Sequence, residues 1–588
     1  MKHILQEYFG YSSFRPGQQQ LIDYAINNIP TLGILPTGGG KSICYQVPGI
    51  YKGGLTLVIS PLISLMKDQV DALNASGIKA SYINSSLTKQ EMRAVETQLI
   101  SGECQFLYVA PERFDNHSFQ QLLYALDIRL VAFDEAHSIS KWGHDFRPSY
   151  RDVVQKVMTL PHHFTLMALT ATATVDVKKD ICSLLHIQLE HVVETSTKRE
   201  NLKFIVDPTY QKQKMVIDYI KSHSDASGII YASTRKQVEL LSEVFEVNQI
   251  RHTCYHAGLK KEEKERNQSV FVRDDIPVMI ATNAFGMGID KSNVRYVIHY
   301  NMPQDLESYY QEAGRAGRDG LKSECILMYS EADIKLQHFF IETAPEPVQE
   351  LKKDKLSKMI QYTKTKRCLQ STIINYFNPN EPLKNCGQCS NCLSQDENYN
   401  MTTEAKQILS CLIRIKIPVT KHLLSKVLHG ENDDQIHNES LHKLSTFGLL
   451  KDYEASAVQS FIDTLIFNGY IRIHDHYLYC DEAAKAILFN DEQVMTYYKP
   501  NQYNEKVKIT TIGAVDDTLL RALKTARKEL SERLDIPPFT IFSDHTLELF
   551  ADKKPVSKED MILIEGVGSY KLKHYCPKFI EVIQDYVS

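Results

Sequence analysis

The sequence lacks three features that would point to particular classes of protein. No uninterrupted apolar run approaches the roughly 20 residues that a membrane-spanning helix needs. The opening stretch, MKHILQEYFGYSSF, has neither the apolar core nor the cleavage site of a secretory signal. The chain also has no net positive charge, since 67 lysines and arginines stand against 72 aspartates and glutamates. We therefore expect a cytoplasmic protein in which any contact with nucleic acid depends on locally gathered basic residues.

Tryptophan is the scarcest residue, with one copy in 588 residues. That residue, Trp142, lies in DEAHSISKWGHDFRPSY (134–150), close behind an acidic pair and among other aromatic rings. The surrounding WGHDFRP is polar and bounded by glycine and proline, which is poor material for a hydrophobic core. A functional role for Trp142 is therefore favoured over a place in the core.

Short β-branched runs alternate with helical stretches from residue 30 to about residue 335. LTLVIS (55–60), RLVAFDEAH (129–137) and IPVMIAT (276–282) are examples, and continuous apolar strands of this kind are buried on both faces. Such strands are typical of parallel sheets wrapped by helices. The series runs twice, with a break near 194–204, so the sequence predicts two α/β domains followed by smaller, mainly helical parts.

The stretch GILPTGGGKSICYQ (33–46) has the composition of a phosphate-binding loop. Glycines let backbone N–H groups approach phosphate oxygens, Lys41 supplies a positive charge, and the hydroxyl of Ser42 can ligate Mg²⁺. Leu35 stands where the standard pattern has a glycine, five places before Gly40. A glycine turn that binds no nucleotide therefore stays open as an alternative at this point.

An acidic pair, Asp134 and Glu135, follows the apolar strand in RLVAFDEAH. The carboxyl ends of strands are where open α/β sheets bind ligands. Asp134 would hold Mg²⁺ through its water shell, and Glu135 would orient and deprotonate the attacking water. The pair comes downstream of TGGGKS, which strengthens the nucleotide hypothesis considerably.

A third motif, QEAGRAGRDG (311–320), carries an amide and two arginines. On a helix Gln311, Arg315 and Arg318 would share one face, which suits a γ-phosphate whose charge builds during phosphoryl transfer. A salt-bridged surface stripe is the alternative. Gly314 and Gly317 would each weaken a purely structural helix by about 1 kcal/mol, which favours close approach to another group.

Twelve cysteines occur in a chain expected to be reduced, and four of them cluster. Cys368, Cys386, Cys389 and Cys392 supply four thiolates, the complement of a closed tetrahedral zinc site. Such a site leaves no open position for water, so we expect a structural role. Free thiols that lie close by chance are the alternative.

Taken in order, the motifs resemble those of RecQ helicases of the bacterial type, within helicase superfamily 2. The resemblance rests on FGYSSFRPGQQQ (9–20), PTGGGKS (36–42), SPLISLMKDQV (60–70), YVAPER (108–113), DEAH (134–137), LTATAT (169–174), ATNAFGMGIDK (281–291) and QEAGRAGRDG (311–320). It implies an α/β fold with two tandem RecA-like parallel-sheet lobes. A zinc-binding helical hairpin, a winged helix and a small all-α C-terminal domain would follow.

The implied domains follow the changes in composition. They are helicase lobe 1 at 1–195, helicase lobe 2 at 196–340, the zinc-binding domain at 341–398, the winged helix at 399–490, a linker at 491–513 and a helical C-terminal domain of the type shared with RNase D at 514–588. The hairpin-like IRIHDHYLYC (471–480) would be the wing, but its short tip predicts no particular role in strand separation. The basic run 351–367, with seven lysines or arginines against one aspartate, would belong to the helical hairpin.

The resemblance also assigns roles to individual residues. The implied nucleotide contacts are Tyr11, Arg15 and Gln18 around the adenine, then Thr37, Gly38, Gly39, Gly40, Lys41 and Ser42 around the phosphates, with Gln311 from lobe 2. The implied catalytic residues are Lys41, Asp134, Glu135, His137, Arg315 and Arg318, with Arg318 as the arginine finger and Ser42 and Asp134 holding Mg²⁺. His137 would pass the state of the nucleotide to the DNA groove.

In this family the segment after DEAH is an aromatic-rich loop that senses single-stranded DNA. The rings of Trp142, His144 and Phe146 offer faces on which bases stack, at about 1–3 kcal/mol per base. Arg147 would add a phosphate or cation–π contact. Because these residues lie close to the magnesium carboxylate in sequence, base stacking could move the hydrolytic group.

The implied function is an ATP-, Mg²⁺- and Zn²⁺-dependent 3′-to-5′ DNA helicase in repair and recombination, associated with the bacterial nucleoid. Its implied partner is DNA, single-stranded and forked, with a single-strand-binding protein as a further candidate. Two alternatives remain open. One is an RNA helicase, since DEAH also occurs there; the other is a winged-helix DNA-binding regulator with a decayed ATPase, although its catalytic positions are all filled.

Overall fold

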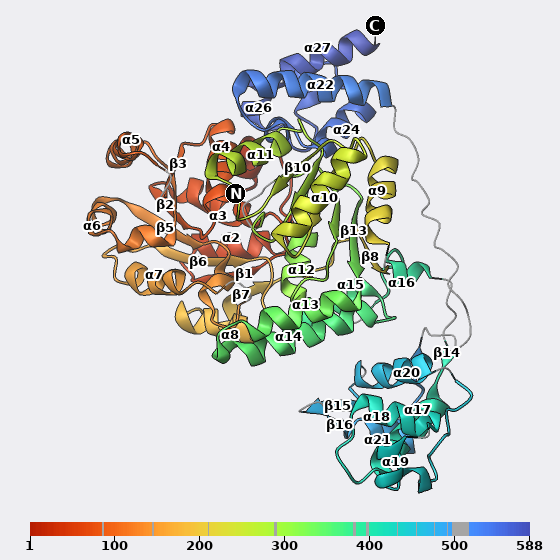
Figure 1. Cartoon of the computed structure of the whole chain (residues 1–588). Helices are drawn as coiled ribbons and strands as arrows, with labels where there is room; N and C mark the ends of the chain where they lie inside the picture. Colours follow the sequence, from red (N-terminus) through yellow and green to blue (C-terminus); the bar gives the residue numbers. More distant parts are fainter. Residues whose placement is uncertain are drawn as a thin grey trace. The chain divides into compact units, whose positions relative to one another are not determined.

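The structure, a computed structural model, divides into two compact units (Figure 1). It describes residues 1–588 apart from 85–86, 144–145, 210, 287–290, 380, 382–383, 395–398, 432, 454, 468, 475–476, 491, 497–516 and 588. Unit 1 comprises Met1–Met359, Gln370–Lys384 and Ile512–Ser588. Unit 2 comprises Ile360–Leu369 and Asn385–Thr511.

Lobe 1, the first part of unit 1, is a seven-stranded parallel sheet in the order β3-β4-β2-β5-β6-β1-β7. Its strands are β1 (Thr31–Ile34), β2 (Leu55–Ile59), β3 (Ala80–Ile83), β4 (Phe106–Val109), β5 (Ile128–Phe133), β6 (Thr165–Thr170) and β7 (Val192–Glu194). Its main helices are α2 (Gln18–Ile26), α3 (Lys41–Lys52), α4 (Ile63–Ala75), α5 (Lys89–Ile100), α6 (His117–Ala125), α7 (Pro148–Met158) and α8 (Val175–Leu184).

Both faces of this sheet are buried, as the apolar strands predict. Along β2, Leu57 and Ile59 enter one core cluster with residues of α6, α7 and α8, while Val58 enters another with residues of α2, α3 and α4. Successive side chains of a strand point to opposite faces, so a strand covered on both sides must be apolar throughout.

Lobe 2 is a six-stranded parallel sheet in the order β10-β11-β9-β12-β13-β8. Its strands are β8 (Leu202–Pro208), β9 (Ser227–Tyr231), β10 (His252–Tyr255), β11 (Val278–Ala281), β12 (Val294–His299) and β13 (Ser323–Tyr329). Its helices are α9 (Lys212–Ser222), α10 (Arg235–Val247), α11 (Lys261–Val272), α12 (Leu306–Ala313) and α13 (Glu331–Glu342). The two parallel sheets confirm the expected α/β organisation.

The chain continues from lobe 2 through the long helix α14 (Glu346–Lys364) and the shorter helix α15 (Leu369–Phe377). Most of the basic run 351–367 lies on α14. The last domain of unit 1 is entirely helical in its described residues and closes around its own core. Its helices are α22 (Asp517–Leu534), α23 (Pro538–Ile541), α24 (Asp544–Lys553), α25 (Lys558–Met561), α26 (Ser569–His574) and α27 (Cys576–Val587).

Unit 2 combines a cysteine-bearing turn with a small helical domain that carries a hairpin. Its elements are α16 (Ser390–Leu393), β14 (Tyr399–Asn400), α17 (Thr402–Arg414), α18 (Lys421–His429), α19 (Asp434–Asn438), α20 (Ala455–Phe467), β15 (Ile471–His474), β16 (Tyr477–Cys480), α21 (Ala484–Phe489) and β17 (Met495–Thr496). Strands β15 and β16 pair antiparallel, so 471–480 is the expected hairpin. The tip residues Asp475 and His476, and most of the expected linker 491–513, lie outside the described residues.

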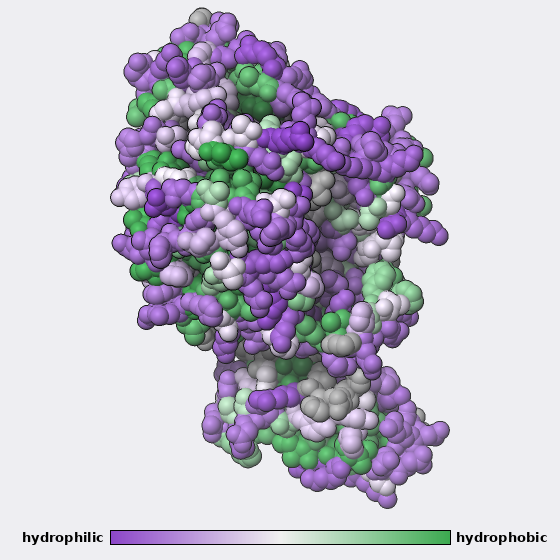
Figure 2. Space-filling model, turned by 90° about the vertical axis from the view of Figure 1, so that its left-hand side faces the viewer, coloured by the Kyte–Doolittle hydropathy of each residue, from purple (hydrophilic) through white to green (hydrophobic). Residues whose placement is uncertain are grey.

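Among the described residues no helix combines the length and the apolar character that crossing a bilayer requires. The face drawn in Figure 2 is mostly hydrophilic, with hydrophobic residues in separate patches. Trp142 and Phe146 are among the large hydrophobic side chains that remain exposed.

Candidate active site

The phosphate loop and the acidic pair are brought together by the strand order of lobe 1. The loop follows β1 and the pair follows β5, and both strands neighbour β6. Because the strands are parallel, their carboxyl ends lie at one edge of the sheet, where such sheets bind ligands. Lys41 Nζ lies 3.8 Å from Glu135 Oε1, and both side chains are 13% exposed.

The phosphate loop is shaped by backbone that only glycine adopts readily. Gly40 has a φ of +76°, in the left-handed region, and a Cβ there would lie 2.4 Å from the side-chain nitrogen of Gln18. Leu35, in place of the usual first glycine, is buried in the core of lobe 1. The loop therefore keeps its turn while Leu35 contributes to packing beneath it.

Gln18 and Arg15 both contact this loop. The Gln18 side chain donates to the carbonyls of Gly39 and Gly40 at 3.1 Å each, and its own oxygen accepts from the backbone N–H of Arg15 at 2.9 Å. Arg15 donates to the carbonyl of Gly38. Both residues thus hold the phosphate loop as well as lining the cavity beside it.

The main chain at the acidic pair is held by strained backbone and by a buried hydrogen bond. Glu135 has a φ of +48°, which is rare for a residue with a side chain and costs about 1–3 kcal/mol. The hydroxyl of Tyr150 on α7, fully buried, donates to the carbonyl of Asp134 at 2.5 Å. Burial, and then the charge of Asp134, raise the pKa of Tyr150, so it stays a neutral donor.

His137 connects the acidic pair with the strand on its other side. Its Nδ1 lies 3.3 Å from Glu135 Oε2 and 3.0 Å from Thr170 Oγ1, at the end of β6. The Thr170 hydroxyl in turn donates to the carbonyl of Thr172 at 3.1 Å. His137 is 1% exposed and therefore lies behind Glu135 rather than on the cavity wall.

The amide and arginines of lobe 2 reach the same cavity, but not on one helix. The expectation that Gln311, Arg315 and Arg318 share a helical face is wrong, because α12 ends at Ala313 and the arginines lie in the turns that follow. Gly317, with a φ of +56°, is incompatible with a continuing helix. A Cβ on the preceding Gly314 would lie 3.1 Å from Cβ of Thr37, so these turns approach the phosphate loop closely.

One cavity of about 500 Å³ gathers most of the predicted residues. The predicted residues that line it are Tyr11, Arg15, Gln18, Thr37, Gly38, Gly40, Lys41, Ser42, Asp134, Glu135, Gln311, Arg315 and Arg318. Gly39 lies between two lining glycines of the same loop. A carboxylate pair, an ammonium and three guanidinium groups around such a cavity can hold and hydrolyse a nucleoside triphosphate.

Arg199 is a residue of this region that the sequence patterns missed. The residue is 9% exposed, and its guanidinium donates to the carbonyls of Thr37, Ala316 (3.2 Å) and Gly317 (2.9 Å). Burial lowers its pKa from the usual value, and the nearby Arg318 acts in the same direction. One side chain thus joins the phosphate loop of lobe 1 to the arginine turn of lobe 2.

The C-terminal helical domain forms a further wall of the cavity. Pro537, Phe539, Glu565 and Lys571 line it, together with residues near Tyr11. The N–H of Gly566 donates to the carbonyl of Gly10 at 3.1 Å, and a Cβ on Gly10 would lie 2.6 Å from the Val567 backbone. Sequence patterns gave no sign of this packing beyond the glycines of EGVG (565–568).

The loop after DEAH exposes two of its rings. Trp142 is 44% exposed and Phe146 is 38% exposed, so neither belongs to a core. Arg147 is half-buried and donates to the carbonyl of Pro61 at 2.7 Å, which anchors the loop to lobe 1. His144 lies outside the described residues.

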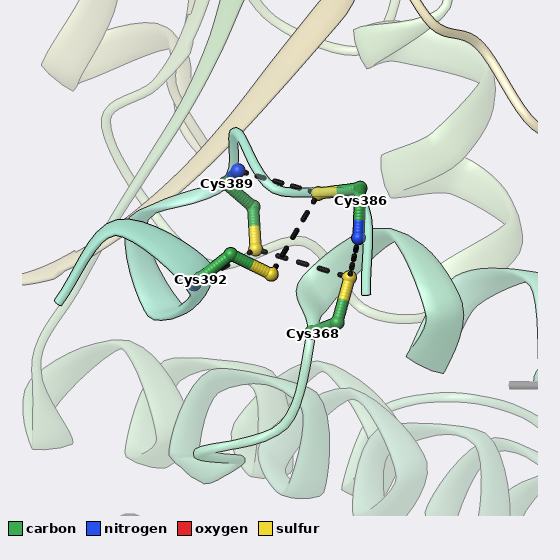
Figure 3. A group of neighbouring side chains, drawn as sticks. All are labelled: Cys368, Cys386, Cys389 and Cys392. Atoms are coloured by element: carbon green, nitrogen blue, oxygen red, sulfur yellow. Dashed lines mark hydrogen bonds between the residues drawn. The ribbon is translucent and has the colours of Figure 1, made fainter. Parts of the chain in front are cut away.

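The four clustered cysteines of unit 2 point toward one centre (Figure 3). Their Sγ atoms all lie within 4.8 Å of one another, with Cys386 to Cys392 at 3.9 Å and Cys368 to Cys389 at 4.0 Å. A tetrahedron of Zn–S bonds of about 2.3 Å places sulfurs about 3.8 Å apart, so the cluster fits zinc. Backbone N–H groups donate to three of the sulfurs at 3.3–3.4 Å, which favours thiolates.

Two parallel sheets that bring a phosphate loop, an acidic pair and two arginines to one cavity define a two-lobed helicase ATPase core. Family models match along the chain: DEAD/DEAH box helicase (15–181), helicase conserved C-terminal domain (211–320), RecQ zinc-binding (331–393), RQC domain (395–505) and HRDC domain (516–583). The chain belongs to the RecQ family of ATP-dependent DNA helicases. The expected zinc domain, winged helix and helical C-terminal domain are thereby confirmed.

Curated relatives match over almost the full length of the chain. The "ATP-dependent DNA helicase RecQ" of Bacillus subtilis is 43% identical over 99% of this chain and 98% of its own. The protein of the same name from Pasteurella multocida is 38% identical over 99% of this chain and 93% of its own. A "Putative ATP-dependent RNA helicase" of Acanthamoeba polyphaga mimivirus is 34% identical over 80% of this chain and 88% of its own.

Proposed function

We propose that this chain hydrolyses ATP to move 3′ to 5′ along one DNA strand and to separate forked duplexes. The cavity of about 500 Å³ carries the proposal, because it joins groups from both lobes around a space suited to a nucleotide. Hydrolysis there would open and close the two lobes against each other. Alternating grips on the phosphates of the DNA strand would then move the chain along it.

Binding of the nucleotide would use the two sides of the cavity differently. Tyr11 would stack on the adenine, while Arg15 and Gln18 would exchange their contacts with the phosphate loop for contacts with the base. The glycine N–H groups of 37–40 would then bind the phosphates, with Lys41 against the outer ones. The hydrogen bonds that Gln18 makes to Gly39 and Gly40 support this role, because they tie adenine recognition to the loop's conformation.

Hydrolysis would depend on the acidic pair. Ser42 and Asp134 line the cavity with oxygen ligands and would hold Mg²⁺, which lowers the charge repulsion between phosphates and attacking oxygen when it is bound. Glu135 would accept a proton from the attacking water. His137, whose Nδ1 lies 3.3 Å from Glu135 Oε2, would position Glu135 and report its state to the DNA groove.

Residues of lobe 2 would stabilise the negative charge that develops on the γ-phosphate. Arg318 would contact this phosphate as the arginine finger, with Arg315 and Gln311 beside it. The close approach of Gly314 to Thr37 supports this arrangement, because it lets the arginine turns reach the phosphate loop. Movement of lobe 2 would therefore control the rate of hydrolysis.

DNA would be sensed by the loop after DEAH. Bases of an unpaired strand would stack on Trp142 and Phe146, with His144 as a third candidate ring. Arg147, which holds the loop to Pro61, would transmit the movement as well as contact phosphate. The exposure of both described rings supports this role. A single-strand-binding protein stays a candidate partner, and the bacterial nucleoid the expected location.

An unwinding assay with matched substrates tests the proposal. We expect unwinding of a 3′-tailed DNA duplex in the presence of ATP and Mg²⁺, and little of its 5′-tailed counterpart. Glu135→Gln should abolish unwinding while ATP still binds. Faster unwinding of a matched RNA duplex would favour the activity named for the mimiviral relative. Absence of ATP hydrolysis with single-stranded DNA would favour a DNA-binding regulator instead.

A further inference from the structure

Two buried carboxylates lie at the start of α12, the helix that leads to the arginine turns. Asp305 caps this helix, accepting from the backbone N–H of Ser308 at 2.7 Å, and is 4% exposed. Glu307, in the first helical turn, is also 4% exposed. Burial, and then the neighbouring Glu307, raise the pKa of Asp305 to about 6. Two such acids this close together need a compensating cation.

Lys355 on α14 supplies that cation. Its Nζ lies 2.9 Å from Glu307 Oε1, and the two side chains are 11% and 6% exposed. The same Nζ donates to the backbone carbonyl of Trp142 at 3.4 Å. A single ammonium group therefore contacts the arginine helix of lobe 2 and the ring-bearing loop of lobe 1.

We infer that Lys355 is a positioning residue that couples the aromatic loop to the arginines of the ATP site. It holds the carbonyl of Trp142 and the carboxylate of Glu307, and α12 continues from Glu307 directly into the turns with Arg315 and Arg318. When a stacked base displaces the loop, the hydrogen bond between the Lys355 ammonium and the Trp142 carbonyl changes. The ammonium group then interacts with Glu307 of α12 alone. The inference rests on the proposed role of the loop in binding DNA.

The route through Lys355 differs from the route through His137. His137 lies at the start of the loop and contacts Glu135, so this route stays within lobe 1. Lys355 contacts the middle of the loop and also Glu307 of lobe 2. The arginines of lobe 2 would stabilise the charge that develops on the γ-phosphate. Loss of Lys355 should therefore leave ATP binding and the slow hydrolysis without DNA nearly unchanged, and should reduce the acceleration by DNA.

Lys355→Met tests this, with Lys353→Met as a matched control. Lys353 lies on the same helix, is 47% exposed and pairs with the exposed Glu350, three residues away. We expect the ratio of kcat with saturating oligo(dT) to kcat without DNA to fall about 5- to 10-fold in Lys355→Met, with KM for ATP within about twofold. Lys355→Arg, which keeps the cation, should restore the ratio. An unchanged ratio in Lys355→Met would overturn the inference.

A second variant separates coupling from folding, because Lys355→Met leaves Glu307 buried opposite no cation. The double variant Glu307→Gln with Lys355→Met removes both charges of this pair, so no Glu307 carboxylate is left buried without its cation. A ratio that stays low in the double variant supports coupling through the pair. A ratio restored to that of the unmodified chain shows that the buried charge alone caused the loss, and overturns the inference.

Fluorescence distinguishes this inference from the proposed function, because Trp142 is the only tryptophan. Oligo(dT) should change its emission equally in the unmodified chain and in Lys355→Met, which shows that DNA still reaches the loop. If DNA does not change the Trp142 emission of the unmodified chain, the loop's role and the inference are both refuted. A response to DNA combined with an unchanged kcat ratio in Lys355→Met would refute the inference alone.

Discussion

Arg199→Met is a demanding test of how the two lobes are joined at the nucleotide site. Methionine has a similar length and no charge, so it removes the hydrogen bonds while filling most of the space. Gly317 keeps a partner, because its carbonyl also accepts from Asn201 at 2.8 Å. The carbonyls of Thr37 and Ala316 lose the donor that Arg199 provided.

The size of the effect follows from those two carbonyls. Each unsatisfied buried acceptor costs about 1–3 kcal/mol, and removing a buried guanidinium returns part of that cost. A net loss of about 2 kcal/mol lowers Tm by about 4–8 °C for a domain of this size. The phosphate loop also becomes less ordered before ATP binds, so KM for ATP should rise about 5- to 10-fold.

Calorimetry and steady-state ATPase measurements check both effects. Lys198→Met is the control, since the neighbouring Lys198 is 47% exposed and pairs with the exposed Glu200. Arg199→Lys should recover only part of the loss, because an ammonium cannot reproduce the planar fork of donors. If Arg199→Met and Lys198→Met share the same Tm and the same KM, Arg199 does not join the lobes in the way argued.

Three further outcomes are expected. Cys389→Ser should lower the zinc content of purified protein from about one per chain and destabilise unit 2. Cys480→Ser, which lies outside the cluster, should keep the full zinc content. Elemental analysis showing full zinc in Cys389→Ser would contradict the site. Asp305→Asn should raise Tm at pH 8 by removing an ionised buried acid, with only about half of this gain in stability left near pH 5. The raised pKa makes the folded state bind more protons than the unfolded state between about pH 4 and 6, so the cost of Asp305 is full above pH 6 and is lost as the pH falls to about 4. A Tm difference that is the same at both pH values would contradict this. Trp142→Ala should retain ATP binding but lose most of the stimulation of hydrolysis by DNA, and equal stimulation in both proteins would refute the loop's role.

Much of the site could be predicted because it depends on local sequence at strand ends. The phosphate loop after β1 and the acidic pair after β5 follow from apolar strands that end in glycines or carboxylates. The zinc ligands were predictable from their spacing alone. The prediction failed where backbone geometry overrode a periodic pattern. The helix expected through Arg318 ends at Ala313, and the positive φ of Gly317 is incompatible with its continuation.

The parts that escaped prediction depend on contacts between distant segments. Arg199 lies in the break between two domains, and nothing in that stretch indicates that its guanidinium is buried against two lobes. Tyr150 was one ring among several behind DEAH, but only packing against β5 makes it a buried donor to Asp134. The docking of the last helices beside Tyr11 joins residues more than 500 positions apart, which no local pattern encodes.

That docking bears on experiments with shortened chains. A fragment ending before α22 would lack Pro537, Phe539 and Lys571, and Gly10 would lose its neighbour at Gly566. The cavity beside Tyr11 would open to solvent where the intact chain has a protein wall. Affinities for ATP or for competitive inhibitors measured on such a fragment would therefore describe an incomplete pocket, and inhibitor selection should use a chain that includes the last helices.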